Sequence, residues 1–294
     1  MNRKSKCQMK RCFSAILALL LIYCCASPAF SISPLNGADF ATKDLTTGEV
    51  TYLKASDLPT TRSSATVVPA YEGPESAPSS IMPRDIIGGD NRTKISDTTV
   101  FPYRAIGYID VKWPNGASTI GTAWLFKSDA IVTAGHCVYN SSRGGWASRI
   151  TFYPGRNGNT APYGSAYSIS MGTPTPWINN SDNTMDYGLV KLNRTIGSST
   201  GWFGYGYNQT SVGTKVRISG YPGEKSQTQW AMNGNIFAQS EHRMWYTIDT
   251  TGGQSGSPIY LPTYTAVGVH TTGLTTWNGG KRIHEDMFNW MKSF

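Results

Sequence analysis

Short runs in which apolar and polar residues alternate cover the chain from about residue 86 onward. They lie at 103–111, 119–126, 130–133, 187–192, 215–219, 244–248, 258–260 and 266–270. In a strand, alternation buries one face and leaves the other solvated. Clusters of Gly, Asn, Pro and Ser separate the runs, and short strands with this spacing are typical of an all-β barrel or sandwich.

The last segment, 281–294, has a different period. Its large apolar residues fall at i, i+4, i+7, i+8 and i+11, which is one face of a helix: Ile283, Met287, Trp290, Met291 and Phe294. The pattern therefore predicts a C-terminal α-helix that packs on the β domain.

Residues 1–31 have the parts of a secretory signal peptide. Residues 1–11 are basic, 13–26 are apolar, and small residues come next, so that cleavage is expected after Ala29 or Ser31. The apolar run is shorter than the roughly 20 residues that span a membrane. We therefore expect a secreted, extracellular protein without stable membrane association.

Residues 32–84 differ from the β-rich remainder of the chain. The stretch 58–84 is rich in Ser, Pro and Thr and has little periodicity, which indicates a propeptide and linker rather than a folded domain. Arg84 precedes the sequence DIIGG, and a junction there would give a mature domain of 85–294. Within that domain we expect a boundary between two halves near 195–205.

Composition narrows the class of protein. The 294-residue chain has a formal net charge of +8, but only 15% of its residues are charged, too few for a coiled coil or a typical disordered protein. No basic stripe with interleaved aromatic residues appears, so we expect no nucleic-acid partner. Four of the five cysteines lie in the predicted signal peptide, and the remaining Cys137 predicts a mature domain without an intramolecular disulfide.

Three local patterns carry chemistry. They are VTAGHC at 132–137, DYGLVKL at 186–192 and GGQSGSP at 252–258. A serine hydroxyl such as that of Ser255 is a weak nucleophile and needs a base, which His136 can supply, while Asp186 can orient the imidazole. Glycines around Ser255 allow the backbone N–H groups of Gly253 and Ser255 to converge on one oxyanion position. The chain order His, Asp, Ser is that of the chymotrypsin architecture.

These motifs resemble the trypsin/chymotrypsin superfamily of serine proteases, and more narrowly the bacterial secreted glutamyl endopeptidases. Further matching stretches lie at 90–93, 101–104, 154–158, 163–164, 219–223 and 268–271. The resemblance covers nearly all of 86–294. It implies two six-stranded antiparallel β-barrels, chymotrypsin-like, with the active site between them.

The resemblance also implies the site residues. It makes His136 the general base, Asp186 its orienting acid and Ser255 the nucleophile, and it places His270 in a specificity pocket that binds a glutamate carboxylate. Thr250 is expected as a second donor there, and Thr271 as a further substrate-binding residue. Many relatives pair the cysteine of TAGHC with one on the preceding strand, but Gly121 holds that place here, so Cys137 should be unpaired and buried.

Asp249 leaves a different specificity open. It lies six residues before Ser255, the spacing at which trypsin-type proteases carry the acid that binds Lys or Arg. We expect cleavage after Glu, less readily after Asp, because of His270. Only three glutamates lie beyond Arg84 (Glu224, Glu241 and Glu285), which would limit self-digestion. A non-catalytic secreted binding protein with a protease fold is the alternative from another class.

The remaining expectations concern partners. No HExxH, paired CxxC or EF-hand pattern appears, so no metal and no cofactor are expected. The partners should be protein or peptide substrates and a separate activating protease, because a cut after Arg84 is not one that a Glu-specific enzyme makes. A monomer is expected. His242 and His284 are interpreted as surface residues.

Overall fold

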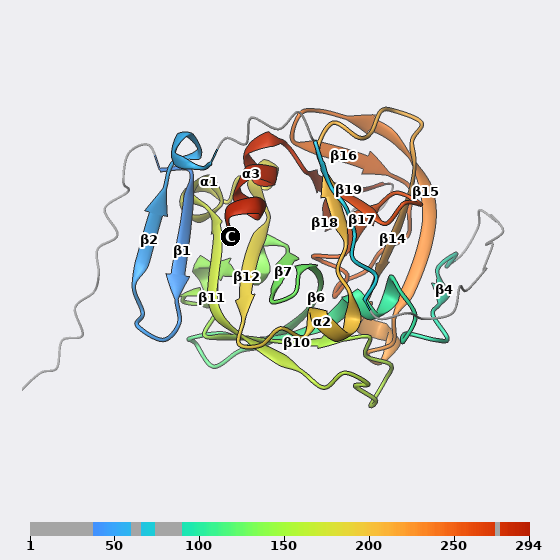
Figure 1. The fold of residues 1–294 in the computed structure, drawn as a ribbon, viewed down its shortest axis with the longest axis horizontal. Coiled ribbons are helices and arrows are strands. Elements are labelled where there is room, and N and C mark those ends of the chain that lie inside the picture. Colours follow the sequence, from blue (N-terminus) through green and yellow to red (C-terminus); the bar gives the residue numbers. More distant parts are fainter. Residues whose placement is uncertain (1–37, 60–65, 74–89, 274–276) are drawn as a thin grey trace, which may run out of the picture. The chain divides into compact units, whose positions relative to one another are not determined.

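In the computed structural model, six antiparallel strands form a closed first barrel, and Figure 1 labels five of them: β6, β7, β10, β11 and β12. The structure describes residues 38–59, 66–73, 90–273 and 277–294. Each strand is antiparallel to the next, and β10 pairs with β11 to complete the ring. In spatial order the strands are β10 (Arg149–Pro154), β5 (Ile106–Lys112), β6 (Ser118–Lys127), β7 (Ala130–Thr133), β12 (Gly188–Leu192) and β11 (Ala166–Pro174).

The second barrel has the same construction, and β17 pairs with β18 to close it. Its strands, in spatial order, are β17 (Pro258–Tyr260), β14 (Lys215–Gly220), β15 (Trp230–Gln239), β16 (Arg243–Tyr246), β19 (Asn278–Arg282) and β18 (Thr265–Gly273). The prediction of two six-stranded antiparallel barrels is therefore confirmed. Each of the eight predicted runs overlaps one of these strands, although residues 103–105 form a 3-10 turn before β5.

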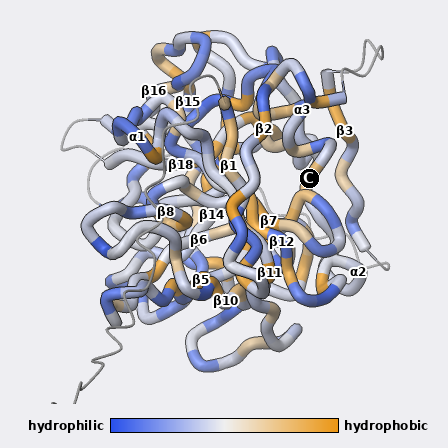
Figure 2. Tube along the Cα trace, turned by 90° about the vertical axis from the view of Figure 1, so that its left-hand side faces the viewer, coloured by the Kyte–Doolittle hydropathy of each residue, from blue (hydrophilic) through white to orange (hydrophobic). Residues whose placement is uncertain are grey.

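The hydrophobic cores of the two barrels are formed by apolar residues from the alternating runs. Ile109, Leu125 and Val190 point into the first barrel, while Ile218 and Ile259 point into the second, and all five are buried. Figure 2 shows an apolar stretch along β7, with hydrophilic residues on the outer loops. A third cluster of large aromatic residues, including Trp124, Tyr221 and Trp290, joins elements of both barrels and the C-terminal helix.

The C-terminal helix α3 (Glu285–Ser293) is shorter than predicted. Lys281 and Arg282 belong to β19, where they pair with β18 and β16, and Ile283 precedes the helix. Met287, Trp290 and Met291 form its buried face, as predicted. The interpretation of His284 as a surface residue is wrong: it is 8% exposed, and the His242 ring lies 4.8 Å from it.

Part of the predicted propeptide is integrated into the sheets. The strands β1 (Phe40–Asp44) and β2 (Val50–Leu53) form a hairpin in which β1 pairs with β11. Further along, β3 (Val67–Val68) pairs with β13 (Gly204–Gly206), which lies parallel to β18. The segment thus adds strands to both sheets, a feature that its composition did not indicate.

Short elements complete the chain. They are β4 (Thr93–Lys94), β8 (Tyr139–Asn140), β9 (Gly145–Trp146), α1 (Thr175–Asn180) and α2 (Gly197–Thr200). Residues 35–294 form one unit, and the predicted signal peptide lies outside the described residues. In the described part of the chain, no helix has the length and apolarity to cross a membrane.

Candidate active site

Two paired strands bring His136 and Asp186 together. His136 lies in the 3-10 turn Gly135–Cys137 after β7, and Asp186 precedes β12. Because Gly188 pairs with Thr133, the ends of these strands meet. His136 Nδ1 is 2.8 Å from Asp186 Oδ2, and the His136 backbone N–H donates to Asp186 Oδ1 at 2.9 Å. The carboxylate therefore fixes the ring and keeps a proton on Nδ1, which leaves Nε2 free to act as a base.

The electrostatics of this pair favour the charged imidazole. Burial lowers the pKa of His136, but the negative charge of Asp186 and its hydrogen bond more than offset this effect and hold the pKa above its ordinary value. Asp186 is only 3% exposed, so little solvent screens its charge. The pair is thus arranged to accept a proton and stabilise the resulting cation.

The turn that carries Ser255 packs against the end of β7. The Thr122 N–H donates to the Ser255 carbonyl oxygen at 2.9 Å, and the Gly256 N–H donates to the His270 carbonyl oxygen at 2.8 Å. A Cβ at position 256 would lie 2.3 Å from Thr133 Oγ1, so this close approach requires glycine, which also has φ +92°. Within the described residues no hydrogen bond joins Ser255 Oγ to His136, and in unliganded enzymes such bonds are often formed only with substrate bound.

The amides expected to form the oxyanion hole are unpaired. Between Gly252 and Gly256, the Gln254 N–H donates to the Thr251 carbonyl oxygen, whereas the N–H groups of Gly253 and Ser255 donate to no other group among the described residues. Gly253 has φ +95°, and a Cβ there would lie 2.6 Å from the Tyr221 carbonyl oxygen. The Thr122 hydroxyl donates to the Gly253 carbonyl oxygen at 2.9 Å, which fixes the orientation of the following peptide.

His270 is buried on β18, at 3% exposure, and its Nδ1 lies 2.7 Å from the Tyr246 hydroxyl. Burial and the nearby charge of His136 lower the pKa of His270 to about 3, so its ring is neutral at neutral pH. Tyr246, which holds the ring, carries no sequence signal beyond its place in an alternating run. The structure therefore adds it to the site.

Thr271 lies on β18, and Thr250 lies beside this strand. Thr250 Oγ1 is a buried hydroxyl without a hydrogen-bond partner among the described residues, and a Cβ at Gly273 of β18 would lie 3.8 Å from it. Thr271 comes directly after His270 and is 8% exposed, with its Oγ1 3.3 Å from Thr272 Oγ1. Thr250 thus has an unused donor near the strand that carries His270.

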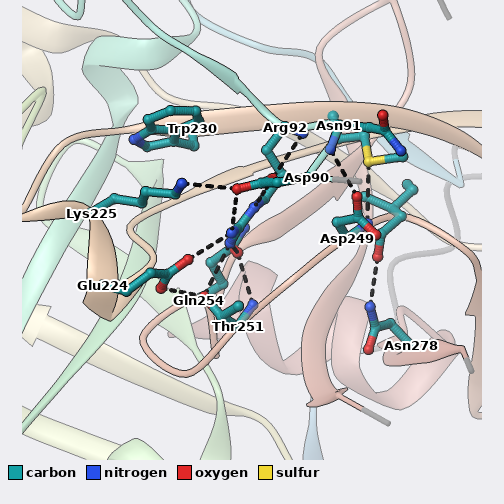
Figure 3. A network of polar contacts seen from close by, with 12 residues as sticks. Asp90, Asn91, Arg92, Glu224, Lys225, Trp230, Asp249, Thr251, Gln254 and Asn278 are labelled. Carbon is teal, nitrogen blue, oxygen red and sulfur yellow. Dashed lines mark hydrogen bonds and ion pairs between the residues drawn. The ribbon is translucent and has the colours of Figure 1, made fainter. Parts of the chain in front are cut away.

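Asp249 has a structural partner. Its Oδ2 accepts a hydrogen bond from the Asn91 backbone N–H at 3.0 Å (Figure 3). At least one carboxylate oxygen is therefore engaged by the 90–92 segment. Cys137 is buried and unpaired, as expected, and a Cβ at Gly121 would lie 3.1 Å from its Sγ.

Comparison with known proteins identifies the family. The trypsin-like peptidase domain matches residues 121–269. A glutamyl endopeptidase from Bacillus licheniformis is 40% identical over 241 residues, which cover 76% of this chain and 73% of that protein. The chain belongs to the glutamyl endopeptidases of the trypsin-like peptidase family.

A solved structure agrees with this placement among glutamyl endopeptidases, whereas the printed name of another relative differs. A solved structure, a Glu endopeptidase in complex with MPD, is 33% identical with a TM-score of 0.64, covering 71% of this chain and 98% of that one. A Bacillus subtilis protein named extracellular metalloprotease is 42% identical over 217 residues, covering 71% of this chain and 69% of that protein. In the described residues no three His, Cys, Asp or Glu side chains are grouped to hold a metal ion, so they do not fit a metal centre.

Proposed function

We propose that this glutamyl endopeptidase hydrolyses peptide bonds after Glu, and less readily after Asp, through a triad of His136, Asp186 and Ser255. The observation that carries the proposal is the 2.8 Å pair of His136 and Asp186 beside a turn whose Gly253 and Ser255 amides are unpaired. Acyl transfer needs this combination of an oriented base, a hydroxyl and two oxyanion donors.

In this mechanism Ser255 Oγ attacks the carbonyl carbon of the scissile bond while His136 Nε2 accepts the hydroxyl proton. The carbonyl oxygen becomes an oxyanion that accepts hydrogen bonds from the Gly253 and Ser255 amides. As the C–N bond breaks, His136 returns the proton to the leaving amine. A water molecule then attacks the acyl-enzyme by the same route and releases the acid and Ser255.

The specificity arises from the neutral His270. A substrate carboxylate that leaves water needs hydrogen-bond donors, or its desolvation costs several kcal/mol. The Tyr246 hydroxyl at Nδ1 leaves His270 Nε2 as the donor in the tautomer we infer, and Thr250 Oγ1 has a free proton to donate. Cleavage after Lys or Arg would instead need the Asp249 carboxylate, one oxygen of which is already engaged by Asn91.

We also propose that the chain is made as a secreted precursor. Residues 1–31 would be removed as a signal peptide and 32–84 as a propeptide, which leaves 85–294 as the monomeric mature enzyme. A cut after Arg84 does not suit a Glu-specific enzyme, so we expect a separate activating protease unless cleavage after Glu75 suffices. A catalytically dead precursor that is still processed at Arg84 in its host would support the separate protease.

The test is a digest of a denatured protein mixture by purified 85–294, with the cut sites mapped by mass spectrometry. Cuts concentrated after Glu support the proposal, whereas cuts after Lys or Arg would assign the pocket to Asp249. Ser255→Ala should lower turnover by roughly six orders of magnitude, because the triad acts as a unit. Near-normal activity in that variant would overturn the triad, and unchanged preference for Glu in His270→Val would overturn the pocket.

A further inference from the structure

A buried arginine from outside both barrels is bonded to the turn that precedes Ser255. Arg92 has a side chain that is only 5% exposed, and it makes contacts with three separate segments of the chain (Figure 3). Its Nη1 donates to Gln254 Oε1 at 2.8 Å and to Thr251 Oγ1 at 3.0 Å. A guanidinium offers several donors in a fixed plane, so it can hold such groups in one geometry.

The acceptors of Arg92 on the turn are themselves bonded to each other. Gln254 Oε1 also accepts from the Thr251 N–H at 3.0 Å, and Gln254 N–H donates to the Thr251 carbonyl oxygen at 3.1 Å. Gln254 is 1% exposed and lies between Gly253 and Ser255, the residues whose amides are proposed to bind the oxyanion. A shift of Gln254 would therefore move the Ser255 amide, which shares its peptide bond, and would release the Thr251–Gln254 turn that holds the Gly253 amide.

Two carboxylates hold the guanidinium in place. Arg92 Nε and Nη2 donate to Asp90 at 2.8 and 3.0 Å, and Nη2 donates to Glu224 Oε1 at 2.6 Å. Glu224 Oε2 in turn accepts from the Thr251 hydroxyl at 2.6 Å, and Lys225 pairs with Asp90 at 2.8 Å. The hydrogen bonds of Arg92 and Lys225 hold the pKa of Asp90 well below its usual range, so the carboxylate stays charged at neutral pH.

We infer that Arg92 is a positioning residue that preorganises the oxyanion hole through Gln254 and Thr251. The inference rests on the proposed function, and it adds a residue that contacts neither the substrate nor the triad. Preorganised donors stabilise the charge that develops in the transition state more than they stabilise bound substrate. Loss of Arg92 should therefore lower kcat and leave KM nearly unchanged.

The test compares Arg92→Ala with the wild-type 85–294 enzyme on a Glu-containing peptide. Removal of one oxyanion donor costs about 10²–10³-fold in kcat, so a displaced hole should lower kcat by about 10-fold to 100-fold while KM changes less than twofold. Added guanidinium ion, at concentrations that leave the wild-type unchanged, should restore part of the lost kcat. Arg217→Ala is the matched control, because Arg217 is a partly buried arginine bonded to Asn233 at 3.2 Å.

A double-mutant cycle separates positioning from a general loss of stability. In a Gln254→Met background, Arg92→Ala should cost much less than in the wild type, because contacting residues of one network are not additive. Equal costs in both backgrounds would overturn the inference, as would a folded Arg92→Ala enzyme with kcat within twofold of wild type. If Arg92→Ala does not fold, Arg92→Lys carries the same test and keeps the charge without the planar fork. Failure of the wild type itself to cleave after Glu would overturn the proposed function, and this inference with it.

Discussion

In the proposed mechanism, the charge on the His136 ring sets the acid limit of the reaction, because only a neutral imidazole can accept the Ser255 proton. The Asp186 carboxylate holds the pKa of His136 above the ordinary 6.5, so kcat/KM should fall with decreasing pH through a value above 6.5. In Asp186→Asn, the acidic limb of the pH–rate profile should move to lower pH. The value of kcat should also fall by about 10⁴-fold, because the His136 tautomer with its proton on Nδ1 is no longer favoured. A pH–rate profile of both enzymes measures this, and an unmoved limb would show that another group titrates.

Lys281 is a buried lysine, and the ion pairs among the described residues do not include it. It is 0% exposed, with its Nζ 3.3 Å from His242 Nδ1 and 5.5 Å from the centre of the Tyr187 ring. Burial lowers the pKa of Lys281 to about 7. Since the pKa in the unfolded chain is about 10.4, the unfolded state binds more protons between pH 7 and 10.4, and stability rises with pH across that window.

Lys281→Met should remove this pH dependence. The variant should be more stable than the wild type at pH 7 and below, by an increment that shrinks towards zero above about pH 10.4. Thermal unfolding from pH 6 to 10.5 measures the difference, with the exposed Lys215→Met as control. A constant difference in Tm across the range would mean that packing, rather than the charge of Lys281, is responsible.

Among the elements, β6 and the 3-10 turn Gly135–Cys137 face each other across a distance that suits a disulfide. A Cβ at Gly121 would lie 3.1 Å from Cys137 Sγ, close to the roughly 3 Å between Cβ and the far sulfur that an S–S bond of about 2.05 Å implies. The same Cβ would touch the Ile109 side chain at 3.1 Å, so the site is tight. Geometry here allows the bridge that the sequence lacks.

Gly121→Cys should therefore form a disulfide with Cys137 under oxidising conditions. A closed loop of about 15 residues gives about 3 kcal/mol of stabilisation, less the cost of crowding against Ile109. Thiol titration and thermal unfolding with and without reductant measure the bridge, and Gly121→Ala reports the crowding alone. Two free thiols in the oxidised, folded variant would contradict the prediction.

Across the whole molecule, the described segments 38–59 and 66–73 join parts that are distant in sequence. β1 pairs with β11, Phe40 stacks on Trp290 of α3 with ring centres 4.5 Å apart, and β3 pairs with β13. Arg104, which is buried, donates to the Glu72 carbonyl oxygen. If the mature enzyme is 85–294, these contacts exist only in the precursor, where they can guide assembly of the barrels and the helix.

Refolding should therefore depend on this segment. We expect 85–294 alone to refold in lower yield than 32–294, and a peptide of residues 38–73 added in trans to restore part of the yield. Phe40→Ala in the precursor should weaken the effect, since loss of a buried Phe side chain typically costs about 3–5 kcal/mol, whereas the exposed Thr51→Ala should not. Activity recovered after dilution from denaturant measures the yield, and equal recovery with and without the segment would contradict the prediction.

Local sequence patterns predicted many of the strands and the motifs of the candidate site. Alternation predicted strands at each of the eight runs because side-chain direction in a strand depends only on position along the chain. The eight runs did not include β10, β11, β15 or β19. In β15 and β19, glycines such as Gly234, Gly279 and Gly280 interrupt the alternation, and neighbouring strands supply the pairing. The three motifs that carry the proposed triad were recognisable because each is contiguous and their order along the chain is specific.

Contacts between distant residues were decided only by the tertiary structure. The Tyr246 hydroxyl on His270, the Asn91 amide on Asp249 and the guanidinium of Arg92 on Gln254 join residues that are 24, 158 and 162 positions apart. Burial of Lys281 and His284 likewise arises where β19 and α3 pack against the loop that carries Asp186. A sequence pattern reports which side chains share a face, but the partner, exposure and pKa of each depend on the groups that the closed barrels bring against it.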